Sequence, residues 1–175
     1  MILVTGASGK TGQAVVEALV VKKQSVRVLV RCQEQVVKAY EIGAVDVVVG
    51  DIADESVIRQ AALGACALYH ICPNVHADEI AIGEASIGAA IAAGVQHLVF
   101  HSVLHPQIEA MPHHWRKMRV EEALFESGLS FTILQPSTYM QNIIAKWDEI
   151  VDRGVLAAPY SVESQSSPVD LHDVA

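Results

Sequence analysis

The sequence predicts an α/β fold of the Rossmann type, in which helices flank a doubly wound parallel sheet. Short runs rich in β-branched residues alternate with segments of helical length from the first residue onward, a pattern typical of βαβ units. A glycine-rich segment stands between the first such run and the first helical segment, where it would form a tight strand-to-helix turn. Strands connected in this way form a parallel sheet with right-handed crossovers.

Six strands and six helices are expected in alternation. The run at residues 45–49 is almost entirely valine, as expected of a parallel strand that is covered on both faces. Gly94 and Gly154 each follow a helical segment and are expected to end it. The strands are expected at residues 2–5, 26–30, 45–49, 67–72, 96–101 and 131–134. The helices are expected at residues 13–21, 33–42, 54–63, 79–93, 114–126 and 139–152.

Composition limits the size of the fold and the classes of partner. With 175 residues, 51% of them hydrophobic, the chain is long enough for one compact domain and too short for two full ones. The net charge is −8, the pI is about 5.4, and the 12 basic residues are scattered. Binding to nucleic acid or to an anionic membrane surface is therefore not expected.

The sequence carries no pattern of a secreted or membrane protein. A charged leader with a long apolar segment and a cleavage site is absent, and no apolar run approaches the roughly 20 residues that span a bilayer. The three cysteines, Cys32, Cys66 and Cys72, form no CxxC pair and are expected to be reduced thiols. We therefore expect a cytoplasmic protein.

The strongest chemical signal is the segment from residue 5 to residue 12, which reads TGASGKTG. Gly6 permits the sharp turn, Gly9 lets the backbone approach a pyrophosphate, and Gly12 lets the helix pack closely on the strand. The free N–H groups and the positive end of the helix dipole then face the phosphates. This context predicts binding of a nicotinamide dinucleotide, the alternative being a glycine turn without a ligand. Side-chain donors to the phosphates are expected from Ser8, Lys10 and Thr11.

The tip of the second strand distinguishes NADP(H) from NAD(H). An Asp or Glu at this point would hold the ribose hydroxyls and repel a 2′-phosphate. Here the strand ends in Arg31, and the first acid is Glu34. A guanidinium suits a phosphate because it can donate two parallel hydrogen bonds. NADP(H) is therefore the expected cofactor, with NAD(H) the alternative.

Residues at the ends of the third and fourth strands are expected to complete the cofactor site. Asp51 follows the third strand and is expected to accept a hydrogen bond from the adenine amino group. The competing interpretation is that Asp51 caps the next helix, a role that Asp54 could equally fill. The remaining cofactor contacts are expected from Ile52, Ile71, Cys72 and Pro73.

These motifs together resemble the NmrA-like branch of the atypical short-chain dehydrogenases. The resemblance runs along essentially the whole chain and implies an NAD(P)-binding Rossmann domain at residues 1–154. It also implies that residues 155–175 begin a small C-terminal substrate lobe that is largely missing. Such proteins include NADPH-dependent quinone, dye and isoflavone-type reductases, and non-catalytic regulators that sense NADP(H). The resemblance is carried by residues 5–12, Val30-Arg31, Gly50-Asp51, residues 101–105, residues 117–129 and residues 131–136.

The resemblance also assigns roles to single residues. Ser102 stands where related dehydrogenases keep a catalytic serine. Lys117 matches the lysine of a YxxxK pair, which holds the nicotinamide ribose, but His113 stands where the tyrosine should be. The segment that lines the nicotinamide, and the residues that face the substrate, are matched by Pro136, Ser137, Tyr139 and Asn142.

The missing tyrosine leaves the proton donor open. Hydride transfer to a carbonyl needs a proton for the developing alkoxide. His113 is one candidate because imidazole titrates near neutral pH, although it could equally be an exposed residue at a helix start. Tyr139 is another candidate, with a pocket wall as its alternative role. Quinone-like substrates need less from the protein, since solvent can protonate a delocalised product.

Other functional patterns are weak. His101 and His105 lie four residues apart, but on a strand end and in a loop, so the helical zinc geometry does not apply and no metal site is expected. Ser102 lacks the G-x-S-x-G elbow of a hydrolase.

Three functions remain in order of preference. The first is an NADPH-dependent oxidoreductase that transfers hydride to a small electrophile, such as a quinone or enone, bound in the cleft. The second is a non-catalytic NADP(H)-sensing regulator that binds a protein partner. The third is an epimerase-like enzyme for nucleotide sugars, which would also need the YxxxK pair. Either a monomer or a homodimer is compatible with the sequence.

Overall fold

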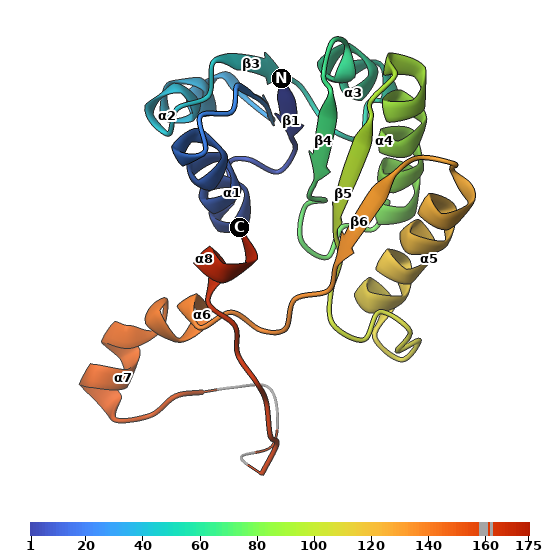
Figure 1. Cartoon of the computed structure of the whole chain (residues 1–175). Helices are drawn as coiled ribbons and strands as arrows, with labels where there is room; N and C mark the ends of the chain where they lie inside the picture. The colour runs from blue at the N-terminus through green and yellow to red at the C-terminus, as the bar shows by residue number, and fades with distance from the viewer. Residues whose placement is uncertain (158–160, 162) are drawn as a thin grey trace.

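The computed structural model describes residues 1–157, 161 and 163–175. Four residues of the predicted 155–175 segment, at positions 158–160 and 162, lie outside the described residues. The described chain contains one parallel sheet of six strands in the order β3-β2-β1-β4-β5-β6 (Figure 1). This order confirms the predicted Rossmann fold, with the direction of winding reversing between β1 and β4. The strands are β1 (Ile2–Val4), β2 (Val26–Val30), β3 (Asp46–Val49), β4 (Ala67–His70), β5 (His97–His101) and β6 (Phe131–Leu134).

Helices cover the sheet in two layers (Figure 1). On one face lie α1 (Lys10–Val21), the short 3-10 helix η1 (Gln33–Gln35) and α2 (Val36–Glu41). On the other face lie α3 (Glu55–Ala62), α4 (Glu79–Ala93) and α5 (Pro112–Glu126), which pack side by side. Gly94 ends α4 in the left-handed conformation with φ 69°, as predicted.

The alternation of side chains along the strands produces two separate cores. Leu3 and Leu68 point into the core beneath α3, α4 and α5, whereas Val4 and Tyr69 point into the core beneath α1 and α2. All four are buried, with Leu3, Val4 and Leu68 fully so. Both faces of the central strands are therefore dry, which explains why apolar side chains point to both faces of these strands.

The single helix predicted at residues 139–152 is wrong. The chain forms two short helices, α6 (Gln141–Ile144) and α7 (Trp147–Arg153), separated at Lys146, whose φ and ψ of −110° and 11° are not helical. Neither helix buries a residue, so no core contact keeps them in line. They project from the sheet in Figure 1, and helical periodicity alone could not reveal the break.

The C-terminal residues return to the first helix. Helix α8 (Leu171–Val174) packs on α1 through the buried Leu171, and the Asp170 side chain caps its first turn. A parallel bridge joins Tyr139 to Val169, which places the end of the chain beside the segment that follows β6. Among the described residues, no helix is long and apolar enough to cross a membrane.

The contact between α4 and α5 gives a direct test of this packing. A Cβ at Gly83 would lie 2.5 Å from a methyl carbon of Val120 on α5, so we expect Gly83→Ala to lower the free energy of unfolding. Overpacking of this kind costs about 1–3 kcal/mol. Denaturant unfolding followed by circular dichroism measures the change.

Gly88 on the same helix is the matched control. A Cβ added to Gly88 would have no other atom within 4 Å, so Gly88→Ala should raise the free energy of unfolding by about 0.5–1 kcal/mol because alanine is the better helix former. Equal effects of the two substitutions would contradict the close approach of α4 and α5.

Candidate functional site

The glycine turn after β1 is shaped by contacts within the chain itself. Gly6 has φ 63°, and a Cβ there would lie 2.9 Å from both the Cβ and the carbonyl oxygen of Ile71. A Cβ at Gly12 would lie 2.3 Å from the carbonyl oxygen of Gly6. Both positions therefore need glycine so that α1 can pack against the ends of β1 and β4.

Gly9 differs from Gly6 and Gly12 because the packing of the chain does not require a glycine there. Its φ is −81°, and the nearest atom to an added Cβ is the Gly6 carbonyl oxygen at 3.4 Å, an ordinary contact. Gly9 precedes the first turn of α1, and no side chain caps that turn among the described residues. The N–H of Gly9 itself donates to the Gly6 carbonyl oxygen at 3.1 Å, so the open backbone at Gly9 and the N–H groups of the first turn of α1 are what fit the close approach of a pyrophosphate. The exposed side chains of Ser8 and Lys10 lie beside it.

A cavity of about 200 Å³ adjoins the turn on the side of β2. Arg31, at the tip of β2, has an exposed side chain near this cavity, and its backbone N–H donates to Gln35 Oε1 at 2.9 Å. Glu34 and Lys38 both line the cavity, so it offers one acidic and one basic group. Sequence reasoning missed Lys38, although its spacing of four from Glu34 places both on one helical face. The full lining is Ala7, Ser8, Gln13, Val30, Glu34, Gln35, Lys38, Ala39 and Ile42.

The structure separates the two interpretations of Asp51. Asp54 caps α3, because its side chain accepts a hydrogen bond from the Ser56 backbone N–H at 2.8 Å. Asp51 accepts from the Ala53 N–H at 2.9 Å and stays exposed after β3. Its adenine contact remains a prediction. Ile52 packs against the core beneath α3.

Thr5 joins the ends of β1 and β4 at the point where the winding reverses. Its hydroxyl accepts from the Ile71 N–H at 2.9 Å and lies 3.1 Å from the Ile71 carbonyl oxygen and 3.2 Å from His70 Nδ1. The two residues after Ile71, which were predicted to contact the cofactor, differ in exposure. Cys72 is buried, which raises the pKa of its thiol to about 12, and Pro73 is exposed.

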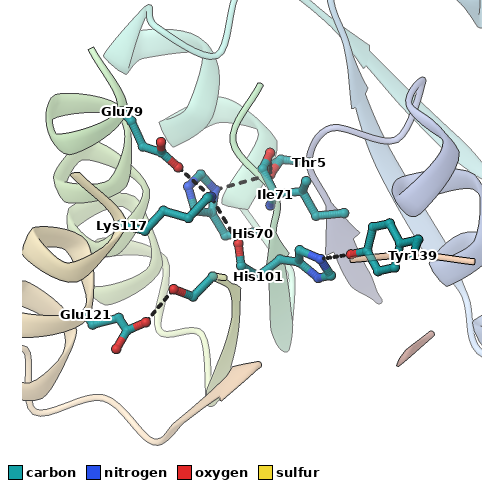
Figure 2. Close-up of polar contacts among 9 residues, drawn as sticks. Thr5, His70, Ile71, Glu79, His101, Lys117, Glu121 and Tyr139 are labelled. Atoms are coloured by element: carbon teal, nitrogen blue, oxygen red, sulfur yellow. Dashed lines mark hydrogen bonds and ion pairs between the residues drawn. The ribbon is translucent and has the colours of Figure 1, made fainter. Parts of the chain in front are cut away.

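Lys117 is half-buried and forms an ion pair with the buried Glu79 (Figure 2). Its Nζ is 2.5 Å from Glu79 Oε1, donates to the carbonyl oxygen of His101 at 3.3 Å, and lies 5.5 Å from the centre of the Phe100 ring. Glu79 is only 1% exposed. The lysine thus fixes the end of β5 to α4. A nicotinamide ribose would therefore have to accept a hydrogen bond from the remaining N–H of the Lys117 ammonium group.

His70 stacks against Phe100 beside this ion pair, with ring centroids 5.8 Å apart. Burial lowers the pKa of His70 to about 3, and the positive charge of Lys117 adds to this effect. The ring is therefore neutral at physiological pH. Its Nε2 atom has no hydrogen-bond partner among the described residues.

Ser102 points into the interior between β5 and α5. It is 4% exposed and donates a hydrogen bond to Glu121, which is buried as well. Gln135 donates to both carboxylate oxygens of Glu121, at 3.0 Å and 2.9 Å. The serine hydroxyl thus makes a structural contact within the chain.

A chain of three hydrogen-bonded rings, from Tyr69, His101 and Tyr139, crosses the end of the sheet, and Figure 2 shows its link between His101 and Tyr139. His101 Nδ1 lies 3.0 Å from the Tyr69 hydroxyl, and His101 Nε2 lies 2.6 Å from the Tyr139 hydroxyl. Burial lowers the pKa of His101 to about 4 and raises the pKa values of both tyrosines. Sequence reasoning weighed His101 only as a metal ligand and missed Tyr69. Their positions near the ends of the paired strands β4 and β5 were the available signal.

Tyr139 also faces the head of α1. The Lys10 ammonium lies 5.6 Å from the centre of its ring and donates to the Asn142 side chain. The Thr11 side chain opposes part of the rise in the pKa of Tyr139. The structure therefore brings Tyr139 and Asn142 next to the predicted pyrophosphate site.

The other predicted site residues lie nearer the surface. His113 is partly exposed in the first turn of α5, packs edge-on against His114 at 4.5 Å, and has its pKa lowered mainly by burial. The Pro136 carbonyl accepts from the Leu104 N–H at 3.0 Å, and the Ser137 hydroxyl donates to the Ser167 carbonyl at 2.6 Å. Within the described ranges, no three His, Cys, Asp or Glu side chains come together as metal ligands would.

The model of one family, described as the NmrA-like family, matches residues 1–173. The chain belongs to the NmrA-like family. It is 30% identical over 179 residues to an NAD(P)H azoreductase of Xenophilus azovorans. It is 32% identical over 178 residues to a (4-alkanoyl-5-oxo-2,5-dihydrofuran-3-yl)methyl phosphate reductase of Streptomyces griseus. Both alignments cover 100% of this chain and 60% of the relative, so the chain spans about three-fifths of their length.

A similar solved structure agrees with this family and with the fold. The NADPH complex of an Escherichia coli NADPH-dependent quinone oxidoreductase has a TM-score of 0.77 and 27% identity. That similarity covers 89% of this chain and 56% of the other.

The neutral state of buried His70 predicts how stability depends on pH. The pKa of His70 is about 3 in the folded chain, against 6.5 for a free histidine, so below about pH 6.5 the unfolded chain binds a proton that the folded chain does not. Stability should therefore fall as the pH drops through this window, and one such group contributes up to about 1.4 kcal/mol per pH unit. His70→Asn should flatten this dependence in urea unfolding.

Phe100→Leu serves as the control because it disturbs the same ring contact without removing a titratable group. We expect it to lower stability at every pH with the slope of the wild type. A His70→Asn curve parallel to the wild type would refute a neutral, buried His70.

Proposed function

We propose that this protein is an NADPH-dependent oxidoreductase that transfers hydride to a small electrophile such as a quinone or an enone. The observation that carries the proposal is the open head of α1. Gly9 is a glycine that the chain's own packing does not need, next to a helix start without a side-chain cap among the described residues. An extended anion such as a pyrophosphate accounts for both features.

The residues around the turn would hold the cofactor in three places. The backbone at Gly9 and Lys10 would bind the pyrophosphate, and Asp51 would meet the adenine at the end of β3. Arg31 and Lys38 would neutralise a 2′-phosphate, which favours NADP(H). Glu34 lines the same cavity and would instead suit the ribose hydroxyls of NAD(H), so the balance of these three side chains sets the preference.

The names of the relatives narrow the substrate class. One reductase acts on a 5-oxo-2,5-dihydrofuran, a ring in which a C=C bond is conjugated with a carbonyl, and another relative is a quinone oxidoreductase. Both substrates are electron-poor conjugated systems. The bound reduced nicotinamide would supply the hydride, while the chain would orient the acceptor and provide a proton from Tyr139 or His113.

A non-catalytic NADP(H) sensor is the second candidate. It is favoured by His113 in place of the usual tyrosine and by the internal contacts of Ser102 and Lys117. Oxidation of NADPH in the presence of a panel of quinones and enones separates the two functions. Turnover supports the reductase, and tight NADPH binding without turnover of any acceptor overturns it in favour of the sensor.

Gly9 provides the sharpest test of cofactor binding. We expect Gly9→Ala to fold as the wild type does, because its Cβ meets only the Gly6 carbonyl at 3.4 Å, yet to weaken binding of NADPH by about tenfold or more through collision with the phosphates. Isothermal titration calorimetry gives the affinity. Gly88→Ala, which adds the same methyl group on α4, should leave the affinity unchanged, and an unchanged affinity in Gly9→Ala would place the phosphates elsewhere.

Arg31 tests the choice between the two cofactors. Removal of a guanidinium that binds a 2′-phosphate should weaken NADPH binding by about 10- to 100-fold and leave NADH binding nearly unchanged. The experiment compares the affinities of both cofactors for wild type and Arg31→Ala. An equal loss for both would remove the case for NADP(H).

A further inference from the structure

The hydrogen-bonded chain of Tyr69, His101 and Tyr139 has two possible arrangements of its protons. His101 is neutral and therefore carries one N–H, which faces either Tyr69 through Nδ1 or Tyr139 through Nε2. The two arrangements differ in where the hydroxyl hydrogen of Tyr139 points. The exposure of the two tyrosines distinguishes them.

Tyr69 is 8% exposed, and among the described residues the one hydrogen-bond partner of its hydroxyl is His101 Nδ1. If His101 donated from Nδ1, the hydroxyl hydrogen of Tyr69 would be buried without an acceptor, which is costly. If Tyr69 donates instead, Nδ1 accepts and the proton of His101 sits on Nε2. Burial of Tyr69 thus selects the Nε2–H form of His101.

We propose that His101 is a positioning residue that donates its Nε2–H to the Tyr139 oxygen, so that Tyr139 turns its own hydroxyl hydrogen outward as the proton donor of the reaction. This inference rests on the proposed function. Tyr139 is only partly buried, so water or a substrate oxygen can accept its hydrogen. The arrangement supplies the donor that His113 leaves missing in the YxxxK position.

The proton balance of the step is complete. The O–H bond of Tyr139 breaks as hydride arrives at the acceptor, and the proton forms a new O–H bond on the developing enolate or alkoxide. The Tyr139 phenolate then accepts the hydrogen bond from His101 Nε2–H, and after product release it regains a proton from water. The Lys10 ammonium, 5.6 Å from the ring, further favours the phenolate.

The groups that face Tyr139 come from two elements and one bridged segment. His101 faces it from β5, and Lys10 and Thr11 face it from α1. Val169 joins it through the backbone bridge. Of these, Lys10 is the charged group, and it lies on the side of the ring toward the predicted pyrophosphate. A bound cofactor would therefore compete with Tyr139 for Lys10, whereas the contact with His101 is internal.

The first test uses the free protein and needs no activity. Nitrogen-15 spectra of labelled histidine report the tautomer, and we expect His101 to carry its proton on Nε2 in the wild type and to lose this preference in Tyr69→Phe. A proton on Nδ1 of the wild type would overturn the proposal, because Tyr139 would then donate to His101 and not outward.

The second test measures the acidity of Tyr139 with carbon-13 label on the tyrosine ring carbon that bears the hydroxyl. Loss of the Nε2–H donor in His101→Leu should raise the titration midpoint of Tyr139, and His101→Gln, which restores an N–H donor, should return it toward the wild type. His97→Leu is the matched control, since His97 lies at the other end of β5 and contacts Ser130 and Thr132. A midpoint unaffected by His101→Leu contradicts the proposal.

The third test compares two acceptors with NADPH. Tyr139→Phe should lower kcat/KM for an enone by about 100- to 10,000-fold, and His101→Leu by about 10- to 100-fold, because the enone product needs a proton. Quinone reduction should change by less than about tenfold, since solvent protonates its product. Equal losses for both acceptors would overturn the role of Tyr139. If neither acceptor is reduced, the proposed function fails, while the tautomer still decides the role of His101.

Discussion

The structure depends on the close approach of α1 to the ends of β1 and β4. Gly12 allows it because a side chain there would collide with the Gly6 carbonyl, and Gly6 allows it because the Ile71 backbone lies against it. Thr5 then joins the two strands by hydrogen bonds to residue 71. Because α1 lies so close, the start of the helix opens onto the point where the sheet reverses its winding, and the proposed pyrophosphate contacts are arranged around that point.

The sequence could predict the fold because the features that define it are local. The sequence contains valine-rich strands, helical segments and three glycines at fixed spacing. These patterns suffice to predict the six strands and the Rossmann type of sheet that they form. The break between α6 and α7 could not be predicted, since helical periodicity says nothing of a segment that buries no residue. Likewise, the role of Asp54 as the cap of α3 could be separated from that of Asp51 only once the hydrogen bonds were known.

The part of the candidate site that lies in local sequence motifs could also be predicted. The glycine turn, Arg31 and Tyr139 stand next to recognisable motifs, whereas the partners of Ser102 and Lys117 come from elsewhere in the chain. Glu79 lies 38 residues before Lys117, and Tyr69 lies 32 residues before His101. No spacing rule links such pairs, because the packing of α4 on α5 brings the first pair together and the pairing of β4 with β5 brings the second together. Hydrogen-bond partners of buried polar side chains are thus hard to predict from sequence when they lie far apart in the chain.

The bridge between Tyr139 and Val169 makes the position of Tyr139 depend on residues that lie far along the chain. Met140 donates to the Val169 carbonyl and Val169 donates to the Thr138 carbonyl, both at 3.0 Å, and Gln141 binds Asp170 and Leu171 by its side chain. The segment that carries Tyr139 is therefore anchored by residues about 30 positions later, which α8 in turn holds against α1. Substitutions that weaken this bridge or the packing of α8 on α1 would leave the sheet intact and yet release the segment that carries Tyr139, so the position of the tyrosine depends on contacts made outside the sheet.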